Sequence, residues 1–271
     1  MERIQKALEK ARDQREQIAT GKELHGQPEQ KKEKEEAGDD IHYSHTRVVP
    51  VSEKTMRENR IVAGIPEHPQ GDIFRVLRTK VLHKMREGGL KSLAVVSPTK
   101  GCGKSMVAAN LAVSISLEMN HTVLLVDLDL RRPSISKYFG FKPEKGIADY
   151  LLDGAELQDL LVHPSIERLV ILPVGRSLPQ SSELLSTNRM TNLVEGITNR
   201  YASRIIIFDL PPLLHMDDAL TLLPQVHASL LVVEEDGSSP DEIKQSLRLL
   251  EGSNLLGTVY NKARQAKLSP Y

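Results

Sequence analysis

The sequence predicts an α/β fold in which a parallel, Rossmann-like sheet is flanked by helices. Short, continuous apolar runs alternate with segments of helical apolar spacing, which is typical of a parallel sheet covered on both faces. A glycine-containing turn joins one run to a helix, and carboxylates end two other runs. We expect strands at 93–97, 122–127, 169–172, 204–209, 229–233 and 256–260, and helices at 74–85, 104–119, 182–200 and 240–250.

The first 60 residues depart from this pattern. Ile4, Ala7, Leu8 and Ala11 have helical spacing, which predicts a short N-terminal helix. The stretch Glu29–Asp40 holds no large apolar residue, which indicates a disordered linker. A short strand is expected at 47–51. We therefore expect a helix with a flexible linker over 1–60, a globular domain over 61–265 and a flexible tail over 266–271.

The composition narrows the class of partner. The 271 residues hold 36 Lys+Arg against 36 Asp+Glu, so the formal net charge is zero and gives no reason to expect nucleic acid. A single cysteine, Cys102, allows no intrachain disulfide and fits a reducing compartment. No apolar run approaches the ~20 residues of a spanning helix. We expect a cytoplasmic protein without a membrane span, held at the inner membrane only through a partner.

The turn Ser97–Ser105 (SPTKGCGKS) carries a phosphate-binding signature between a strand and a helix. Such a turn points backbone N–H groups and the positive end of the helix dipole at phosphates. Lys104 is expected to reach the β- and γ-phosphates, and the Ser105 hydroxyl to bind Mg²⁺. Pro98 stands where the usual motif has Gly or Ala. The residues expected to contact the nucleotide here are Lys100, Gly101, Cys102, Gly103, Lys104, Ser105 and Met106.

Carboxylates close two apolar strands. Asp127 and Asp129 end the run VLLVDLDLRRP, and Asp209 ends IIIFDLPP. The carboxyl ends of parallel strands form the usual ligand edge of a sheet, so these groups suit a Mg²⁺-ATP site. We expect Lys104, Asp127, Asp129 and Asp209 to be catalytic, with Ser105, Asp127 and Asp209 at the metal and Arg131 at the nucleotide. The alternatives are a strand–helix turn that only resembles a phosphate loop, and an Asp pair that only caps a strand.

With these Walker A, A′ and B motifs, the stretch 69–262 resembles the bacterial tyrosine kinases (BY-kinases) of capsule and exopolysaccharide export, a P-loop NTPase family. The resemblance also rests on FG at 139–140, GIADYL at 146–151, LPVG at 172–175, SELL at 182–185 and NK at 261–262. The pieces NRIVAG at 59–64 and ERIQKALEKAR at 2–12 are similar to the free-standing cytoplasmic branch found beside exosortase-linked loci.

The resemblance implies ATP-dependent tyrosine autophosphorylation with Mg²⁺, and a transmembrane chain-length-determinant (Wzz-like) activator. It places Asn261 near the base. The family's subunit-joining E-x-x-R-x-x-R helix corresponds to Asp72, Arg75 and Arg78, which implies a homo-oligomer. The family's C-terminal tyrosine cluster is missing here, which leaves Tyr271 as the phosphoacceptor that is most easily delivered.

Three functions stay open on the sequence alone. The first is a kinase that regulates exopolysaccharide polymerisation and export. The second is an ATP-binding switch of weak catalytic power that controls assembly of the chain-length machinery, which the missing tyrosine cluster favours. The third is a partitioning-type ATPase. Its signature lysine lies five places before the loop lysine, where this chain has Thr99.

Overall fold

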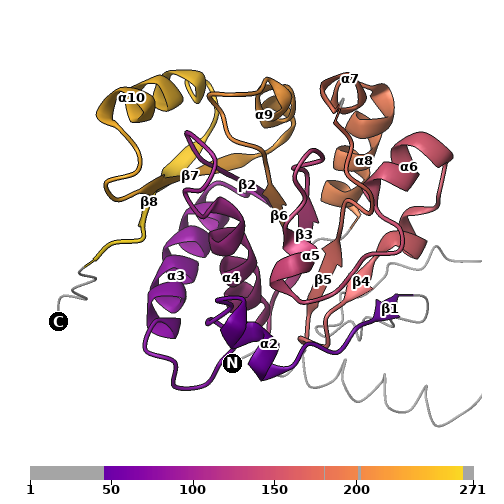
Figure 1. The fold of residues 1–271 in the computed structure, drawn as a ribbon, viewed down its shortest axis with the longest axis horizontal. Helices are drawn as coiled ribbons and strands as arrows, with labels where there is room; N and C mark the ends of the chain where they lie inside the picture. Colours follow the sequence, from indigo (N-terminus) through magenta and orange to yellow (C-terminus); the bar gives the residue numbers. More distant parts are fainter. Residues whose placement is uncertain (1–45, 180, 201–202, 265–271) are drawn as a thin grey trace, which may run out of the picture. The chain divides into compact units, whose positions relative to one another are not determined.

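The structure, a computed structural model, describes residues 46–264 apart from 180 and 201–202. Eight strands of this part of the chain form one sheet in the order β1-β4-β5-β3-β6-β2-β7-β8 (Figure 1). All neighbouring strands run parallel except β4 and β5. The strands are β1 (Arg47–Val48), β2 (Ser92–Val96), β3 (Thr122–Asp127), β4 (Val162–His163), β5 (Leu169–Leu172), β6 (Arg204–Asp209), β7 (Ala228–Glu234) and β8 (Leu255–Asn261).

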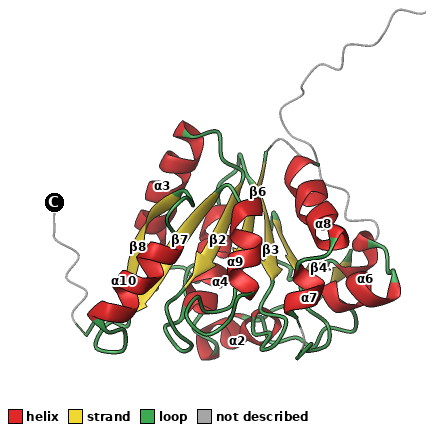
Figure 2. Ribbon diagram, turned by 90° about the horizontal axis from the view of Figure 1, so that it is seen from above, coloured by secondary structure: helices red, strands yellow, loops and turns green. Residues whose placement is uncertain are grey.

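Helices cover both faces of the sheet (Figure 2). Side chains of α2 to α5 join the core on one face, and those of α6 to α10 join the core on the other. The helices are α2 (Glu53–Glu58), α3 (Gly71–Glu87), α4 (Lys104–Ser116), α5 (Ile135–Tyr138), α6 (Ile147–Asp153), α7 (Ser182–Leu185), α8 (Asn188–Asn199), α9 (Asp218–Leu222) and α10 (Pro240–Leu249), with short 3₁₀ turns η1 (Leu157–Leu160) and η2 (Leu223–Gln225).

The central strand β2 shows why these runs are apolar throughout. Leu93 and Val95 pack into one core, and Ala94 and Val96 into the other, because successive side chains of a strand point to opposite faces. Every residue of β2 is buried. A strand with this burial needs helices on both sides, so the predicted α/β class with its flanked sheet is confirmed.

Element boundaries follow the sequence pattern closely where apolar runs are long. The strands β3, β5 and β6 coincide with their predicted ranges. The predicted helix 182–200 divides into α7 and α8, because Thr187 takes an extended backbone conformation and its Oγ1 caps α8 by accepting from the Met190 N–H. The helix predicted to reach residue 119 ends at Ser116. The predicted N-terminal helix, the linker and the tail 266–271 lie outside the described residues.

The segment before α3 is fastened to α4 by one buried amide. Asn110 Oδ1 accepts from the backbone N–H of Val62 (2.8 Å) and Ala63 (3.0 Å). Its Nδ2 donates to the carbonyls of Arg60 and Met106, both at 2.9 Å. β1 and α2, which the sequence pattern grouped with the N-terminal segment, belong to the same compact unit as the sheet. No helix of the described residues is long and apolar enough to cross a membrane.

Asn110→Ala should lower the free energy of unfolding by about 2–4 kcal/mol, because it leaves the buried N–H of Val62 and the half-buried N–H of Ala63 without an acceptor. Asn188→Ala, at an exposed position of α8, should change it by less than about 0.5 kcal/mol. Urea denaturation of both variants measures the difference. Equal losses would show that the Asn110 amide does not anchor the segment.

Candidate active site

The loop between β2 and α4 is shaped to receive phosphates. Gly101 and Gly103 have φ angles of +90° and +89°, which side chains with a Cβ rarely adopt. A Cβ on Gly103 would also come within 2.2 Å of Asn261 Nδ2. α4 begins at Lys104 without a side-chain cap, so its first N–H groups are available to a phosphate.

Lys104 joins two of the predicted carboxylates. Its Nζ lies 3.1 Å from Asp209 Oδ1, 3.3 Å from Asp129 Oδ2 and 3.2 Å from Ser105 Oγ. Lys104 and Asp129 keep 8% and 6% of their surface exposed, and Asp209 none. The pairing of β3 with β6 aligns Asp127 with Asp209, so both strands deliver their carboxylates at one level. The structure thus brings together the four residues predicted to be catalytic.

Asp127 and Asp129 have different environments. Asp127 is 1% exposed, and its carboxylate accepts the backbone N–H groups of Asp129, Ser134 and Ile135. It therefore holds the loop after β3 in place. Asp129 lines the cavity in front of the phosphate loop, where an incoming group can meet it.

Burial and mutual repulsion shift the protonation of this cluster. Burial and the Asp209 charge raise the pKa of Asp127 to about 7. Burial also raises the pKa of Asp209, against the opposing attraction of Lys104. Burial disfavours the Lys104 ammonium, but the charges of Asp209, Asp129 and Asp127 outweigh it and raise the lysine pKa. Without a nucleotide, the positive charge of Lys104 offsets the negative charge of these carboxylates.

A cavity of about 470 Å³ opens in front of the loop. Its walls include predicted residues and others that sequence reasoning missed. Pro212, His215 and Met216 follow β6, so the rule that ligands lie beyond the carboxyl ends of strands could have indicated them. Tyr138 of α5 had no such signal. The cavity is lined by Lys100, Gly101, Gly103, Lys104, Ser105, Asp129, Arg131, Arg132, Tyr138, Pro212, His215 and Met216.

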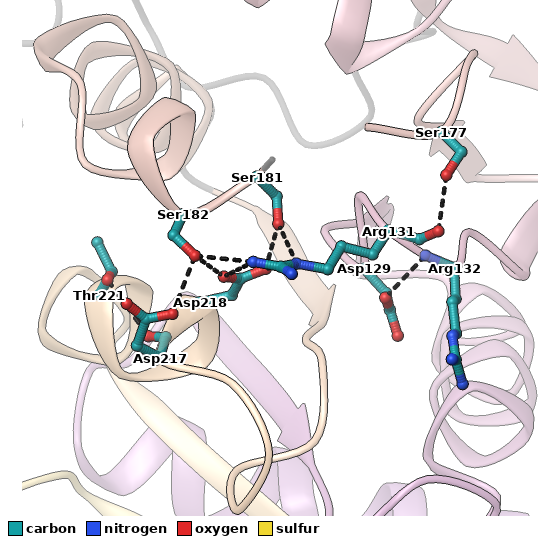
Figure 3. Close-up of polar contacts among 9 residues, drawn as sticks. All are labelled: Asp129, Arg131, Arg132, Ser177, Ser181, Ser182, Asp217, Asp218 and Thr221. Atoms are coloured by element: carbon teal, nitrogen blue, oxygen red, sulfur yellow. Dashed lines mark hydrogen bonds and ion pairs between the residues drawn. The ribbon is translucent and has the colours of Figure 1, made fainter. Parts of the chain in front are cut away.

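Arg131 lies at the cavity wall but is anchored outside it (Figure 3). Its guanidinium donates to Ser181 Oγ (2.9 Å) and Ser182 Oγ (3.0 Å), and contacts both carboxylate oxygens of Asp218. Both serine hydroxyls also donate to Asp218. Burial alone would raise the pKa of Asp218, but the bonds from the serines and Arg131 lower it below its ordinary value. Arg131 therefore couples the loop after β3 to α7 and α9.

The remaining predicted residues fall into three places. Cys102 and Met106 are not among the residues that line the cavity, although the Cys102 carbonyl accepts from Asn261 Nδ2 (2.8 Å). On α3, Arg75 is exposed and forms an ion pair with Asp72 of the same helix. Arg78 is less exposed and bonds to Glu118 and to the Ser114 carbonyl, which lie outside α3. Tyr271 lies outside the described residues.

The donor set fits Mg²⁺ together with a nucleotide rather than a metal held by protein alone. No group of three or more His, Cys, Asp or Glu among the described residues is arranged for a metal ion. Mg²⁺ commonly uses one or two carboxylates and completes its shell with phosphates and water. Asp209 Oδ2 is buried without a hydrogen-bond partner in the described part of the chain, beside Ser105 and Lys104. An oxygen in that state suits a cation.

Comparison with known proteins agrees with this geometry. The model of an AAA domain family matches residues 90–234. The chain is 29% identical over 218 residues to the tyrosine-protein kinase YwqD of Bacillus subtilis, covering 80% of this chain and 91% of that protein. It is 32% identical over 192 residues to the tyrosine-protein kinase etk of Escherichia coli K12, but spans only 26% of that protein's length.

A solved structure of a bacterial tyrosine kinase has a similar fold. The kinase domain of the Escherichia coli tyrosine kinase ETK superimposes with a TM-score of 0.69 at 28% identity, covering 83% of this chain and 94% of that one. The fold that carries the phosphate loop and the two strands ending in carboxylates thus matches the fold of that kinase domain. The chain belongs to the AAA domain family, and its similarity to these enzymes groups it with the bacterial tyrosine-protein kinases (BY-kinases).

Proposed function

We propose that this protein is an ATP-dependent protein tyrosine kinase that regulates exopolysaccharide polymerisation and export. The observation that carries the proposal is the Lys104 ammonium set between Asp129 and Asp209 at a phosphate loop, beside an open cavity. A nucleotide site needs the lysine and the loop amides. A kinase also needs a carboxylate that reaches an acceptor hydroxyl, and Asp129 is the one that lines the cavity.

Each residue of the site has a distinct part in this proposal. The loop amides and Lys104 hold the phosphates, and Lys104 neutralises the charge that develops on them. Ser105 and Asp209, with Asp127 behind them, would hold Mg²⁺, which polarises the phosphates when it is bound. Asp129 accepts the phenolic proton of the acceptor tyrosine. Asp127 keeps the loop that carries Asp129 and Arg131 in its position.

The family and the exposed face of α3 support a proposal about partners. We infer that a transmembrane chain-length-determinant protein activates this cytoplasmic chain and holds it at the inner membrane. We also infer that copies of the chain assemble through Asp72 and Arg75 of α3, whose side chains are more than half exposed. Arg78 supports this surface from beneath, because its side chain is only 17% exposed and bonds within the chain.

Incubation with Mg-ATP should increase the intact mass of the protein by one or more phosphates, carried on tyrosine. Lys104→Met should abolish this increase and weaken ATP binding at least about a hundredfold, because a principal phosphate contact is lost. Lys80→Met, the same change at an exposed position of α3, serves as the control and should behave as wild type. Mass spectrometry and calorimetric ATP titration measure both effects.

Lys104→Met also removes the cation between two buried carboxylates, so it should unfold at lower temperature than wild type. The titration is therefore made well below that temperature. ATP binding by the wild type without any phosphotyrosine, in the presence of the activator's cytoplasmic tail, would contradict the kinase and favour the nucleotide switch.

The nucleotide-free protein should lose stability as the pH rises from 5 to 8. Folded Asp127 keeps its proton to about pH 7, while the unfolded group loses it near pH 4, so the folded state binds more protons in this window. The free energy of unfolding should fall by about 2–3 kcal/mol more in the wild type than in Asp127→Asn. Urea denaturation at both pH values tests this, and parallel slopes would refute it.

Arg75→Glu should convert the assembled protein to smaller species, because it reverses the charge of the exposed ridge of α3. Its melting temperature should stay within about 2 °C of wild type, since Arg75 bonds only to its own helix neighbour among the described residues. Arg86→Glu, exposed on the same helix, is the control. Light scattering measures the masses of the assemblies. An Arg75→Glu protein with the assembly mass of wild type would show that copies do not assemble through this part of α3.

A further inference from the structure

A second cavity adjoins the nucleotide cavity. It measures about 610 Å³ and lies between α5 and the loop that follows β5. Four cationic residues, Arg131, Arg132, Lys137 and Lys142, are part of its lining, and none of the described residues that line it is acidic. We call this cavity the basic groove. Arg131 and Arg132 also line the nucleotide cavity, so the two cavities meet at these residues.

The wall between the two cavities carries the proposed proton acceptor. Asp129 lines the nucleotide cavity, and its Oδ1 accepts from the backbone N–H of Arg132 at 3.1 Å. From the other side, Ser177 of the groove donates through its Oγ to the Arg131 carbonyl at 2.6 Å. A peptide bound in the groove therefore lies next to the segment that holds the catalytic carboxylate.

The groove carries positive charge that the described part of the chain does not neutralise. Arg132, Lys137 and Lys142 are exposed, and none of them forms an ion pair with another described residue. In Figure 3 the Arg132 side chain extends away from the bonds that hold Arg131. An exposed cation without a carboxylate partner is available to a negatively charged ligand.

Two carboxylates near the groove have cations of their own. Glu144, two residues after Lys142, forms an ion pair with Arg47 at 3.0 Å. Asp149 lies close to the glycine in the groove lining and is 4.0 Å from the Arg176 guanidinium. Neither carboxylate therefore cancels the charge of the groove.

The floor of the groove indicates a peptide rather than a nucleotide. Phe141 and Val174 in its lining are buried, so the floor below the cationic rim is apolar. Phe141 is the one aromatic side chain among the described residues that line the groove, and its burial leaves no exposed ring on which a nucleobase could stack. An acidic peptide with an apolar side chain matches both the rim and the floor.

The last tyrosine of the sequence has flanking residues of the wrong charge for this groove. Residues 262–271 (KARQAKLSPY) hold three cationic side chains and no carboxylate side chain. The cationic flank of Tyr271 would be repelled by the arginines and lysines of the groove. The groove thus indicates an acceptor on another protein rather than this stretch.

We propose that the basic groove is the acceptor site of this kinase and that it selects a tyrosine flanked by acidic residues on a second protein. The inference rests on the proposed kinase function and adds the class of substrate to it. The acidic flanks bind Arg132, Lys137 and Lys142, and an apolar neighbour of the tyrosine packs on the floor. The tyrosine then reaches past Arg131 and Arg132 to Asp129.

The transfer is balanced without a further reactant. The tyrosine oxygen forms a bond to the γ-phosphorus of ATP as the bond from that phosphorus to the bridging oxygen breaks. The bridging oxygen keeps the electron pair and leaves with ADP. The phenolic proton passes to Asp129 and then to water.

Two synthetic peptides that differ only in charge test the selectivity. One is Glu-Glu-Ile-Tyr-Glu-Glu, and the other has lysine in place of every glutamate. Each is incubated with the full-length protein, Mg-ATP and the activator's cytoplasmic tail. The initial rate of phosphotyrosine formation gives kcat/KM, which should be at least about tenfold higher for the acidic peptide at low salt. The preference should shrink at about 0.5 M NaCl, because salt screens exposed charges.

Charge reversal in the groove should invert this preference. Lys137→Glu, Lys142→Glu should lower kcat/KM for the acidic peptide at least about tenfold and raise it for the lysine peptide. A misfolded protein would lose activity on both peptides, so the gain on the lysine peptide reports on the groove itself. Lys80→Glu, Lys244→Glu makes the same change in net charge at exposed positions of α3 and α10 and should keep the wild-type preference.

The outcomes separate the inference from the function on which it rests. Autophosphorylation without a preference for the acidic peptide, or without activity on either peptide, would overturn the inference and leave the kinase intact. The milder Lys137→Gln, Lys142→Gln should reduce the preference, and it replaces the charge-reversed variant if that one does not fold. An unchanged preference in the groove variants would overturn the groove as its source. Protein that phosphorylates neither peptide nor itself would contradict the proposed function and, with it, the inference.

Discussion

The compensation of buried charge around Lys104 is the constraint on which the rest of the site depends. Three carboxylates and one ammonium are removed from water at the same edge of the sheet, and each charge is tolerable only while its partners stay within a few ångströms. The register of β3 against β6 is therefore fixed, because a shift by one residue would turn one carboxylate to the opposite face. The apolar strands position the charged cluster, and the cluster is stable only while β3 and β6 keep this register.

The same carboxylates organise loops as well as charge. Asp127 binds three backbone N–H groups of the segment after β3, and this segment carries Asp129 and Arg131. Arg131 then connects this segment to α7 and α9 by its bonds to Ser181, Ser182 and Asp218 (Figure 3). Asn261 at the end of β8 also donates to the Cys102 carbonyl, which connects the phosphate loop to that strand.

The sequence predicted the parts of this arrangement that depend on local pattern. β3, β5 and β6 were located correctly because each is a buried apolar run, and Lys104, Asp129 and Asp209 were found because a glycine loop and strand-end carboxylates are local signals. The Arg131–Asp218 contact was not predicted, since it joins residues 87 apart with no pattern that pairs them. Arg78 was grouped with Asp72 and Arg75 as a residue that joins subunits. Spacing of three on a helix does not reveal that Glu118 lies close enough to hold Arg78.

The single antiparallel pairing has a consequence beyond the sheet itself. If β4 were parallel to β5, β1 would run with the central strands, and the chain before it would leave from the edge opposite to the nucleotide cavity. The reversal at β4 instead places the entry of β1 beside Lys142 and Glu144. Arg47 and the loop that carries Lys142 and Glu144, almost a hundred residues later in the sequence, are thereby brought to the same edge of the sheet.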